Sequence, residues 1–202
     1  MVEEHTDYVS KGKLMSFKHE LFASPIWGFS WINAPQLQIM KDTVKQLSTT
    51  QRNRDKSNFL GWQSSDDLHL HPAFEDLRAT ILTVANGEIA EQFPSYDNRP
   101  FTFESMWANV NYPGAFNMAH IHGAELSGVF YVDVPDPADQ SGRIVLVDPR
   151  QRVNMSEKRI KNLNYPITPA VGACILFPSW LEHYVEPNNT TETRISISFN
   201  LQ

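Results

Sequence analysis

The chain has 202 residues, of which 41% are hydrophobic and 20% charged, enough to bury a core without disulfides or metals as cross-links. This composition excludes a disordered tail, and the net charge of -6 gives no basic surface for nucleic acid or an anionic membrane. The single cysteine, Cys174, excludes an internal disulfide and any multi-thiolate metal site. With neither a signal-peptide pattern nor an apolar run of membrane-spanning length, we expect a soluble cytoplasmic protein.

The N-terminal half predicts helices. Residues 1–14 are polar and aperiodic, which predicts a flexible arm. Between Asn33 and Leu47 the apolar residues recur at helical spacing, with Asn33 as the cap and Pro35 in the first turn. A second amphipathic helix is predicted from Phe74 to about Ile89. We therefore expect one domain over 1–202, in which 15–95 form a helical support.

The C-terminal half, 96–202, predicts a β core. Period-two alternation begins beyond Pro94, and it puts Phe101, Phe103, Trp107, Asn109 and Asn111 on one side of a strand, with Met106, Ala108 and Val110 on the other. Further short β-rich runs lie at 126–134, 143–148, 173–178 and 193–201, separated by turn residues. Many short strands of this kind favour a mainly β fold, a jelly roll or barrel, with the helices packed outside.

The last predicted strand has a polar face of unusual composition. Arg194, Ser196, Ser198 and Asn200 alternate with four apolar residues that alone can serve as the core face. The polar face then either meets solvent or lines a polar cavity inside a β-sandwich. Alternation alone does not distinguish these two interpretations.

Three histidines have a spacing typical of metal ligands. His120 and His122 are two residues apart, so in an extended chain they point the same way, and His183 follows a distant strand. The pair His69 and His71 shows that such spacing is weak evidence by itself, because it precedes Pro72 and a helix start, where a histidine has an ordinary capping use.

The wider sequence context makes the first set specific. In chain order come Tyr112-Pro113-Gly114, His120-Ile121-His122, a strand, His183, and Arg194-Ile195-Ser196. This order resembles the Fe(II)/2-oxoglutarate-dependent oxygenases, above all the prolyl-4-hydroxylase-like branch and a group of little-characterised bacterial and phage oxygenases. Blocks that look like those of this group cover most of the chain from about residue 20, and include Leu21-Phe22, Pro25-Ile26-Trp27, Ser57-Asn58, Gly61-Trp62-Gln63-Ser64, Trp107-x-Asn109, Leu126 to Tyr131, and Phe177-Pro178-Ser179.

The resemblance implies a double-stranded β-helix (jelly roll, cupin-like) that binds Fe(II), 2-oxoglutarate and O2. It implies that His120 and His183 are metal ligands, and that Arg194 binds the distal C5 carboxylate of 2-oxoglutarate, a role that suits a guanidinium fork. Ser196 would donate its hydroxyl to that carboxylate. Tyr131 would lie against the co-substrate, and Tyr112 nearer the metal. The implied reaction hydroxylates an unactivated C–H bond while 2-oxoglutarate is decarboxylated to succinate.

One position departs from the superfamily pattern. The usual His-x-Asp/Glu supplies a carboxylate ligand, whereas this chain has His122 at that place. The third ligand is then His122 itself, Glu125, or water. We favour His122, because its spacing from His120 requires no loop excursion.

Two other classes of function compete with the oxygenase. Three histidines also suit a zinc or cupin-type hydrolase or isomerase, in which metal-bound water reacts, although such a site has no need of Arg194. A non-catalytic jelly-roll binding module is the second rival. The primary substrate is left open among a small molecule, an amino acid and a protein side chain. We expect no nucleic acid or membrane partner, while a spare apolar edge on the N-terminal helix would allow a homodimer.

Overall fold

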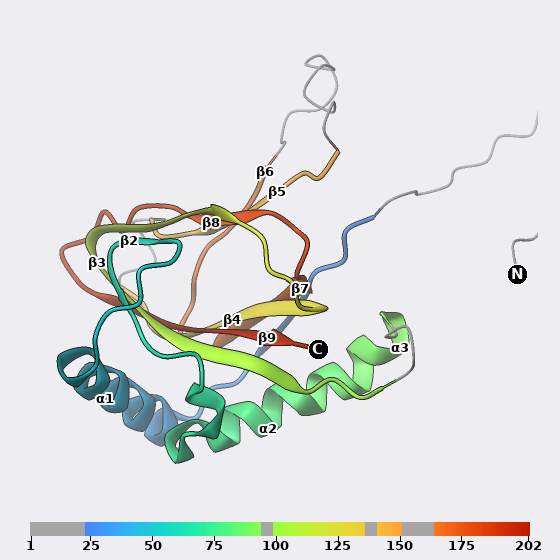
Figure 1. Cartoon of the computed structure of the whole chain (residues 1–202), viewed down its shortest axis with the longest axis horizontal. Helices are drawn as coiled ribbons and strands as arrows, with labels where there is room; N and C mark the ends of the chain where they lie inside the picture. Colours follow the sequence, from blue (N-terminus) through green and yellow to red (C-terminus); the bar gives the residue numbers. More distant parts are fainter. Residues whose placement is uncertain (1–22, 94–98, 136–140, 151–163) are drawn as a thin grey trace, which may run out of the picture.

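The computed structural model describes residues 23–93, 99–135, 141–150 and 164–202 (Figure 1). The expected arm at 1–14 lies outside these residues. Within them the strands are β1 (Trp27–Ser30), β2 (Asn58–Gln63), β3 (Phe103–His120), β4 (Leu126–Asp133), β5 (Ile144–Val147), β6 (Asn164–Ile167), β7 (Ala173–Pro178), β8 (His183–Val185) and β9 (Arg194–Leu201). They form one antiparallel sheet in the order β1-β7-β4-β9-β3-β8-β5-β6, with β2 also paired to β3. The predicted mainly β fold is confirmed.

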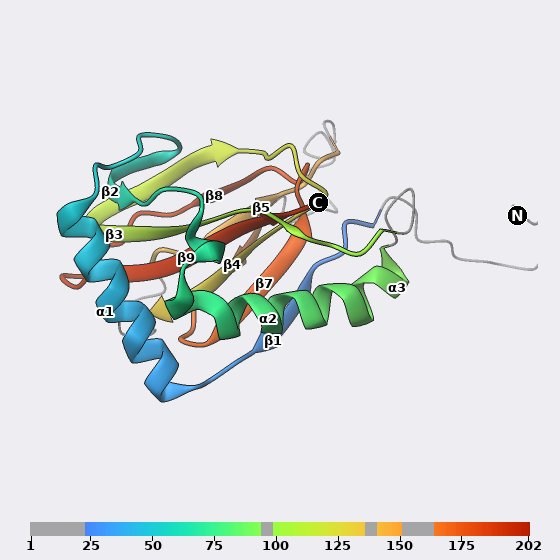
Figure 2. The ribbon, with the colours of Figure 1, turned by 60° about the horizontal axis from the view of Figure 1, so that its bottom comes forward.

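Helices α1 (Ala34–Thr50), α2 (Glu75–Val84) and α3 (Ala90–Gln92) lie on one side of the sheet (Figure 2). Asn33 caps α1 as predicted, since its side-chain oxygen accepts from the amide of Gln36 at 3.3 Å. A π-helical turn over Ala85–Ile89 joins α2 to α3. Residues that share the helical apolar stripes are fully buried against the outer face of the sheet, namely Met40, Val44, Leu77, Ile81, Ala85 and Ile89.

The long strand β3 builds the cavity because it belongs to both layers of the fold. Its first half pairs with β9, from Phe103 to Asn111, and its second half pairs with β8, from Asn117 to His120. The sheet therefore folds over, and β8, β5 and β6 lie above the layer formed by β1, β7, β4 and β9 (Figure 1). Side chains on the facing surfaces of these two layers meet inside.

A register shift in β3 corrects the predicted faces of this strand. The pairing slips between Phe103 and Ser105, which inserts one extra residue as a β-bulge. Phe101 and Phe103 consequently pack with the helix-facing core, whereas Trp107 and Asn109 face the cavity. Strict alternation put all four on one side, and a single bulge reverses the face of every residue beyond it.

The N-terminal part contributes strands as well as helices. Strand β1 pairs with β7 and extends one edge of the sheet, while β2 pairs with the middle of β3. The segment 15–95, expected as a helical support, therefore contains these two strands in addition to its helices. Strands β6 and β8 were also missed, because they have only four and three residues and, unlike the short strand β5, are not continuous apolar runs. In the described part of the chain no helix is long and apolar enough to cross a membrane.

Candidate active site

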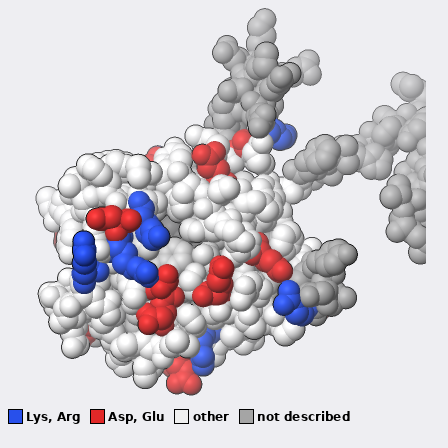
Figure 3. All heavy atoms as spheres, viewed as in Figure 1, with Lys and Arg blue, Asp and Glu red and all other residues white. Residues whose placement is uncertain are grey.

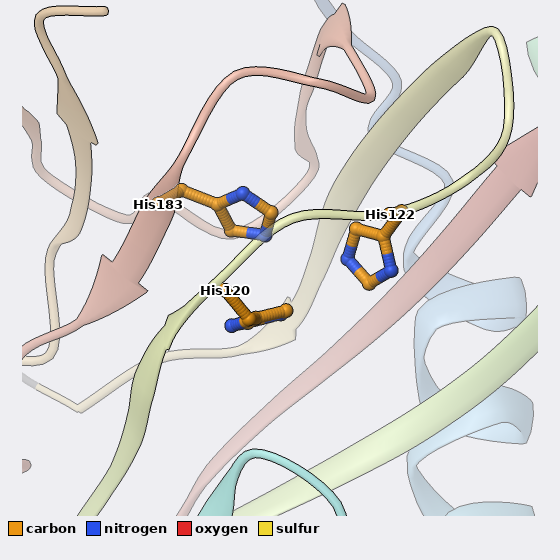
Figure 4. A group of neighbouring side chains, drawn as sticks. All are labelled: His120, His122 and His183. Atoms are coloured by element: carbon orange, nitrogen blue, oxygen red, sulfur yellow. The ribbon is translucent and has the colours of Figure 1, made fainter.

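His120, His122 and His183 converge although 60 residues separate the pair from the third. His120 ends β3, His183 opens β8 directly opposite it, and His122 lies just past the end of β3 (Figure 4). Their ring centroids are 4.4 to 5.2 Å apart. One ligand atom from each lies within 4.8 Å of the others. The fold thus brings together the three residues that the sequence singled out.

Backbone carbonyls orient two of the three rings. Nδ1 of His120 lies 2.6 Å from the carbonyl oxygen of Met118, and Nδ1 of His183 lies 3.0 Å from that of Leu181. A carbonyl oxygen only accepts, so Nδ1 carries the proton in both rings and Nε2 keeps its lone pair. This outer hydrogen bond is the arrangement that fixes a histidine as a metal ligand.

The three imidazoles are neutral at ordinary pH. Burial, together with the smaller effect of the neighbouring histidines, lowers the pKa of His122 to about 4 and that of His183 to about 3. The pKa of His120 is also lowered by burial, against the opposing effect of its hydrogen bond to Met118. Neutral imidazole is the form that binds a metal, so the cluster is ready to coordinate one.

No carboxylate joins this cluster among the residues that the structure describes. Glu125, the alternative third ligand, is half-buried but is not part of the cavity wall. His122 instead lies beside His120, and its ring centroid is 5.7 Å from that of Trp107. The position that usually supplies an acid therefore presents a third imidazole to the same space.

The histidines line one wall of a cavity of about 620 Å3. The whole polar face of β9 lines it too, which decides between the two interpretations of that face in favour of a cavity. Arg194, Ser196, Ser198 and Asn200 all face inward. Cavities of about 300–1,000 Å3 are typical of small-molecule sites.

Arg194 is a buried cation without an acidic partner. Its side chain is 3% exposed, and burial lowers the pKa of the guanidinium. One terminal nitrogen donates to the carbonyl oxygen of Gly142, the other donates to Oδ1 of Asn111 at 2.8 Å, and Nε has no hydrogen-bond partner. No described carboxylate forms an ion pair with it. A buried charge of this kind calls for an anionic ligand.

Tyr131 and Ser196, which the resemblance assigned to the co-substrate, lie beside Arg194. They are cross-strand neighbours on β4 and β9, and both line the cavity. The ring centroid of Tyr131 is 6.0 Å from the guanidinium carbon of Arg194. The hydroxyl of Tyr131 is buried without a partner, and burial raises its pKa to about 12, so it stays a neutral donor.

Tyr112 does not reach the site. It is 42% exposed and absent from the cavity wall, because it follows Asn111 on β3 and points to the opposite side of the strand. Asn111 occupies the inward position and holds Arg194 instead. Sequence reasoning put Asn111 on the same strand side as Trp107 and Asn109 but missed this contact, and nothing in the sequence pointed to Gly142.

Residues 105–200 match the model of a family described as "Putative 2OG-Fe(II) oxygenase". The matched residues include the histidine cluster and Arg194, and the family model together with the solved structures indicates an Fe(II)- and 2-oxoglutarate-dependent oxygenase. Its cofactors are Fe(II) and 2-oxoglutarate, with O2 as the co-substrate that oxygenases of this kind use. No curated protein sequence matches it significantly.

Solved structures agree on the fold of this oxygenase, the double-stranded β-helix. A prolyl-4-hydroxylase from Pseudomonas putida superposes with a TM-score of 0.63 at 13% identity, covering 88% of this chain and 91% of that one. HygX from Streptomyces hygroscopicus, with nickel, 2-oxoglutarate and hygromycin B bound, gives 0.62 at 12% identity, covering 88% and 82%. The epimerase SnoN from nogalamycin biosynthesis gives 0.67 at 13%, covering 89% and 78%.

The residues of this oxygenase fit both cofactors. Two oriented, neutral imidazoles and a third beside them offer nitrogen ligands suited to Fe(II). Arg194 offers an uncompensated charge, and Nε of Arg194 and the hydroxyl of Tyr131 are donors without partners. A dicarboxylate that only accepts hydrogen bonds would satisfy both.

Proposed function

We propose that this oxygenase hydroxylates an unactivated C–H bond of its primary substrate with O2 as the oxidant, so that one oxygen atom enters the hydroxyl group and the other enters succinate as 2-oxoglutarate loses carbon dioxide. The observation that supports it is the pairing, in one cavity, of a neutral histidine cluster with the unpaired cation of Arg194. A hydrolase would need the metal ligands alone. The buried guanidinium has no role there, and burying it without an anion is costly.

The side chains of this protein bind and orient the metal and the co-substrate, and none of them is itself oxidised or reduced. His120, His122 and His183 would hold the iron, which together with 2-oxoglutarate would activate O2, the oxidant of the reaction. Arg194 fixes the co-substrate through its far carboxylate, and Tyr131 with Ser196 directs hydroxyl groups to the same place. Val129 and Phe177 make the adjacent wall apolar and keep water away.

We assign the third metal position to His122. It lies on the same cavity wall as His120, while Glu125 does not line the cavity. Three neutral ligands leave one more positive charge on the metal than the common two-histidine, one-carboxylate set does. Weaker binding of Fe(II) without co-substrate is the expected consequence.

The test is an anaerobic titration of metal-free protein with Fe(II) and then 2-oxoglutarate. A weak visible charge-transfer band that needs both additions is expected for the wild type and for His71→Asn, in which an exposed histidine outside the cavity is replaced by another side chain with a capping acceptor. His183→Ala should abolish it. Tight zinc binding with no band in the wild type would favour the hydrolase rival, and binding of no divalent metal at all would favour the non-catalytic module.

The state of Cys174 is consistent with the expected cellular compartment. Cys174 is a free, buried thiol, and burial raises its pKa far above the usual value, which suits an inert core position in a reducing cytoplasm. The substrate is expected to be a small molecule, an amino acid or a protein side chain, and the N-terminal helix would allow a homodimer.

A further inference from the structure

The cavity extends well beyond the space that 2-oxoglutarate can fill. Arg194 and Asn200 both face inward on β9 and are six residues apart, so about 20 Å of strand separates them. The four carbon–carbon bonds of 2-oxoglutarate, each about 1.5 Å long, span less than about 6 Å. A co-substrate held at Arg194 therefore leaves the Asn200 end of the cavity free.

That free end contains a chain of buried polar groups. The hydroxyl of Ser127 donates to Oδ1 of Asn200 at 2.8 Å, and Nδ2 of Asn200 donates to the hydroxyl oxygen of Ser105 at 3.1 Å. Ser127 is 2% exposed and Asn200 is 8% exposed, and all three side chains line the cavity. They come from β4, β9 and β3, which makes this end a floor formed by three adjacent strands. We refer to Ser105, Ser127 and Asn200 as the polar floor.

The polar floor can both donate and accept further hydrogen bonds. The amide of Asn200 has a second N–H and its oxygen a second lone pair, while Ser105 keeps a hydroxyl proton and Ser127 keeps oxygen lone pairs. Neighbouring donors and acceptors of this kind match a group that itself carries both. A carboxylate only accepts and an ammonium only donates, so neither matches the whole floor.

The floor also lacks charge. Among the described residues of the cavity wall, Arg194 lies at the other end, and Lys56 and Asp66 are exposed. Asp66 is moreover paired with Arg54 at 2.7 Å. Figure 3 shows that basic and acidic side chains are intermixed on the left of the face that it draws. A charged ligand group at the floor would lose its hydration without gaining a counter-charge, which disfavours its binding relative to an uncharged group.

Trp107 relates the floor to the metal position. It pairs with Ser198, one two-residue step before Asn200, and its ring contacts that of His122. One such step is about 7 Å along a strand. A substrate group on the floor therefore lies roughly one strand repeat from the ring that contacts the histidine cluster.

We propose that the polar floor binds an uncharged carboxamide of the primary substrate and sets the position of the oxidised carbon several bonds away from it. The proposal rests on the proposed function, since it takes the histidine cluster as the reacting centre. The amide belongs either to a free small molecule or to a glutamine or asparagine side chain. Both present the same chemistry to Asn200.

The test measures dissociation constants of three probes of equal chain length, hexanamide, hexanoate and hexylamine, by ligand-observed NMR on zinc-loaded protein with and without 2-oxoglutarate. We expect hexanamide to bind at least tenfold more tightly than the two charged probes. In Asn200→Asp, the added charge should weaken hexanamide binding at least tenfold and make hexylamine the preferred probe. A capped glutamine peptide, compared with hexanamide, distinguishes the two sources of the amide.

The control Asn189→Asp makes the same change at an exposed position outside the cavity wall and should leave the probe preference unchanged. Ser105→Ala removes one floor hydroxyl without adding charge and should weaken hexanamide only, and it gives a second variant if Asn200→Asp unfolds. Equal binding of the three probes by wild type, or an unchanged preference in the floor variants, overturns the proposal. Failure of the wild type to bind 2-oxoglutarate would instead overturn the proposed function. The two failures are distinguishable, because the probe preference is also measured without 2-oxoglutarate.

Discussion

Arg194→Gln removes the buried charge from the cavity and keeps a side chain that can still donate to Oδ1 of Asn111. The wild-type guanidinium is 3% exposed, donates to Gly142 and Asn111, and has an unpartnered Nε. Burying this cation without a described acidic partner destabilises the folded wild type, and this effect offsets the hydrogen bonds that the variant loses. We therefore expect the variant without ligand to be within about 1 kcal/mol of wild type in its free energy of unfolding.

The affinity for 2-oxoglutarate should change much more than the ligand-free stability does. Removing one partner of a buried, hydrogen-bonded charge pair reduces the binding free energy by about 2–5 kcal/mol. This corresponds to a dissociation constant that is roughly 30-fold to 4,000-fold larger. At a ligand concentration of 100 times the wild-type constant, bound ligand stabilises the wild type by about 2.7 kcal/mol. A 100-fold loss of affinity reduces this to about 0.4 kcal/mol.

Thermal unfolding of nickel-loaded protein, with and without 2-oxoglutarate, measures the difference. For a chain of this size about 1 kcal/mol shifts the midpoint by about 2–4 °C, so the wild type should gain about 5–10 °C and Arg194→Gln about 1 °C. Arg143→Gln is the matched control, because Arg143 is paired with Glu186 at 2.6 Å outside the cavity wall. If Arg194→Gln keeps the full wild-type shift, the assignment of Arg194 to the co-substrate is wrong.

Three further outcomes test the site. Tyr131→Phe deletes a buried hydroxyl that has no partner, so it should leave ligand-free stability within about 1 kcal/mol and weaken 2-oxoglutarate binding by roughly fivefold to tenfold, measured by the same thermal shift. In a chelator competition, His122→Asp should bind Fe(II) more tightly and His122→Ala less tightly than wild type, whereas an effect of Glu125→Gln would show that Glu125 is the ligand. Metal-free protein should lose stability as the pH falls from about 6.5 toward 4, because the unfolded chain takes up protons there that the folded histidines, with pKa values of about 4 for His122 and about 3 for His183, do not. The slope is at most about 1.4 kcal/mol per pH unit for each histidine, and denaturant melts across this range should show no loss if the three rings are exposed and ordinary.

The sequence predicted the elements whose pattern is long or chemically distinctive. Helix α1 was predicted from its apolar spacing and the Asn33 cap, and β9 from eight residues of unbroken alternation. The histidines and Arg194 were found because metal ligands and buried cations are rare residue types in fixed chain order. These features depend on local periodicity or on chemistry, and both can be read along one chain.

What the sequence missed depends on pairing between distant segments. The bulge at Phe103 to Ser105 exists because the pairing register of β3 and β9 shifts there by one residue, and no residue in that stretch predicts the shift. Tyr112 was expected near the metal because it lies in the Tyr-Pro-Gly block, yet the inward position belongs to Asn111. The polar floor likewise forms only when β3, β4 and β9 lie side by side. Each of these is a property of register, which alternation within one strand does not fix.

The charges of the site couple its two ligands. In the usual two-histidine, one-carboxylate set, a protein acid already offsets one charge of the metal, whereas His120, His122 and His183 are neutral here. Offsetting the charge of the metal would then fall to 2-oxoglutarate, whose other carboxylate, in the proposed binding mode, would offset the charge of Arg194. Metal and co-substrate should consequently strengthen each other's binding by the same factor. The polar floor is uncharged, which is consistent with this arrangement. If the metal and 2-oxoglutarate together offset the charges in the cavity, the primary substrate need carry no charge.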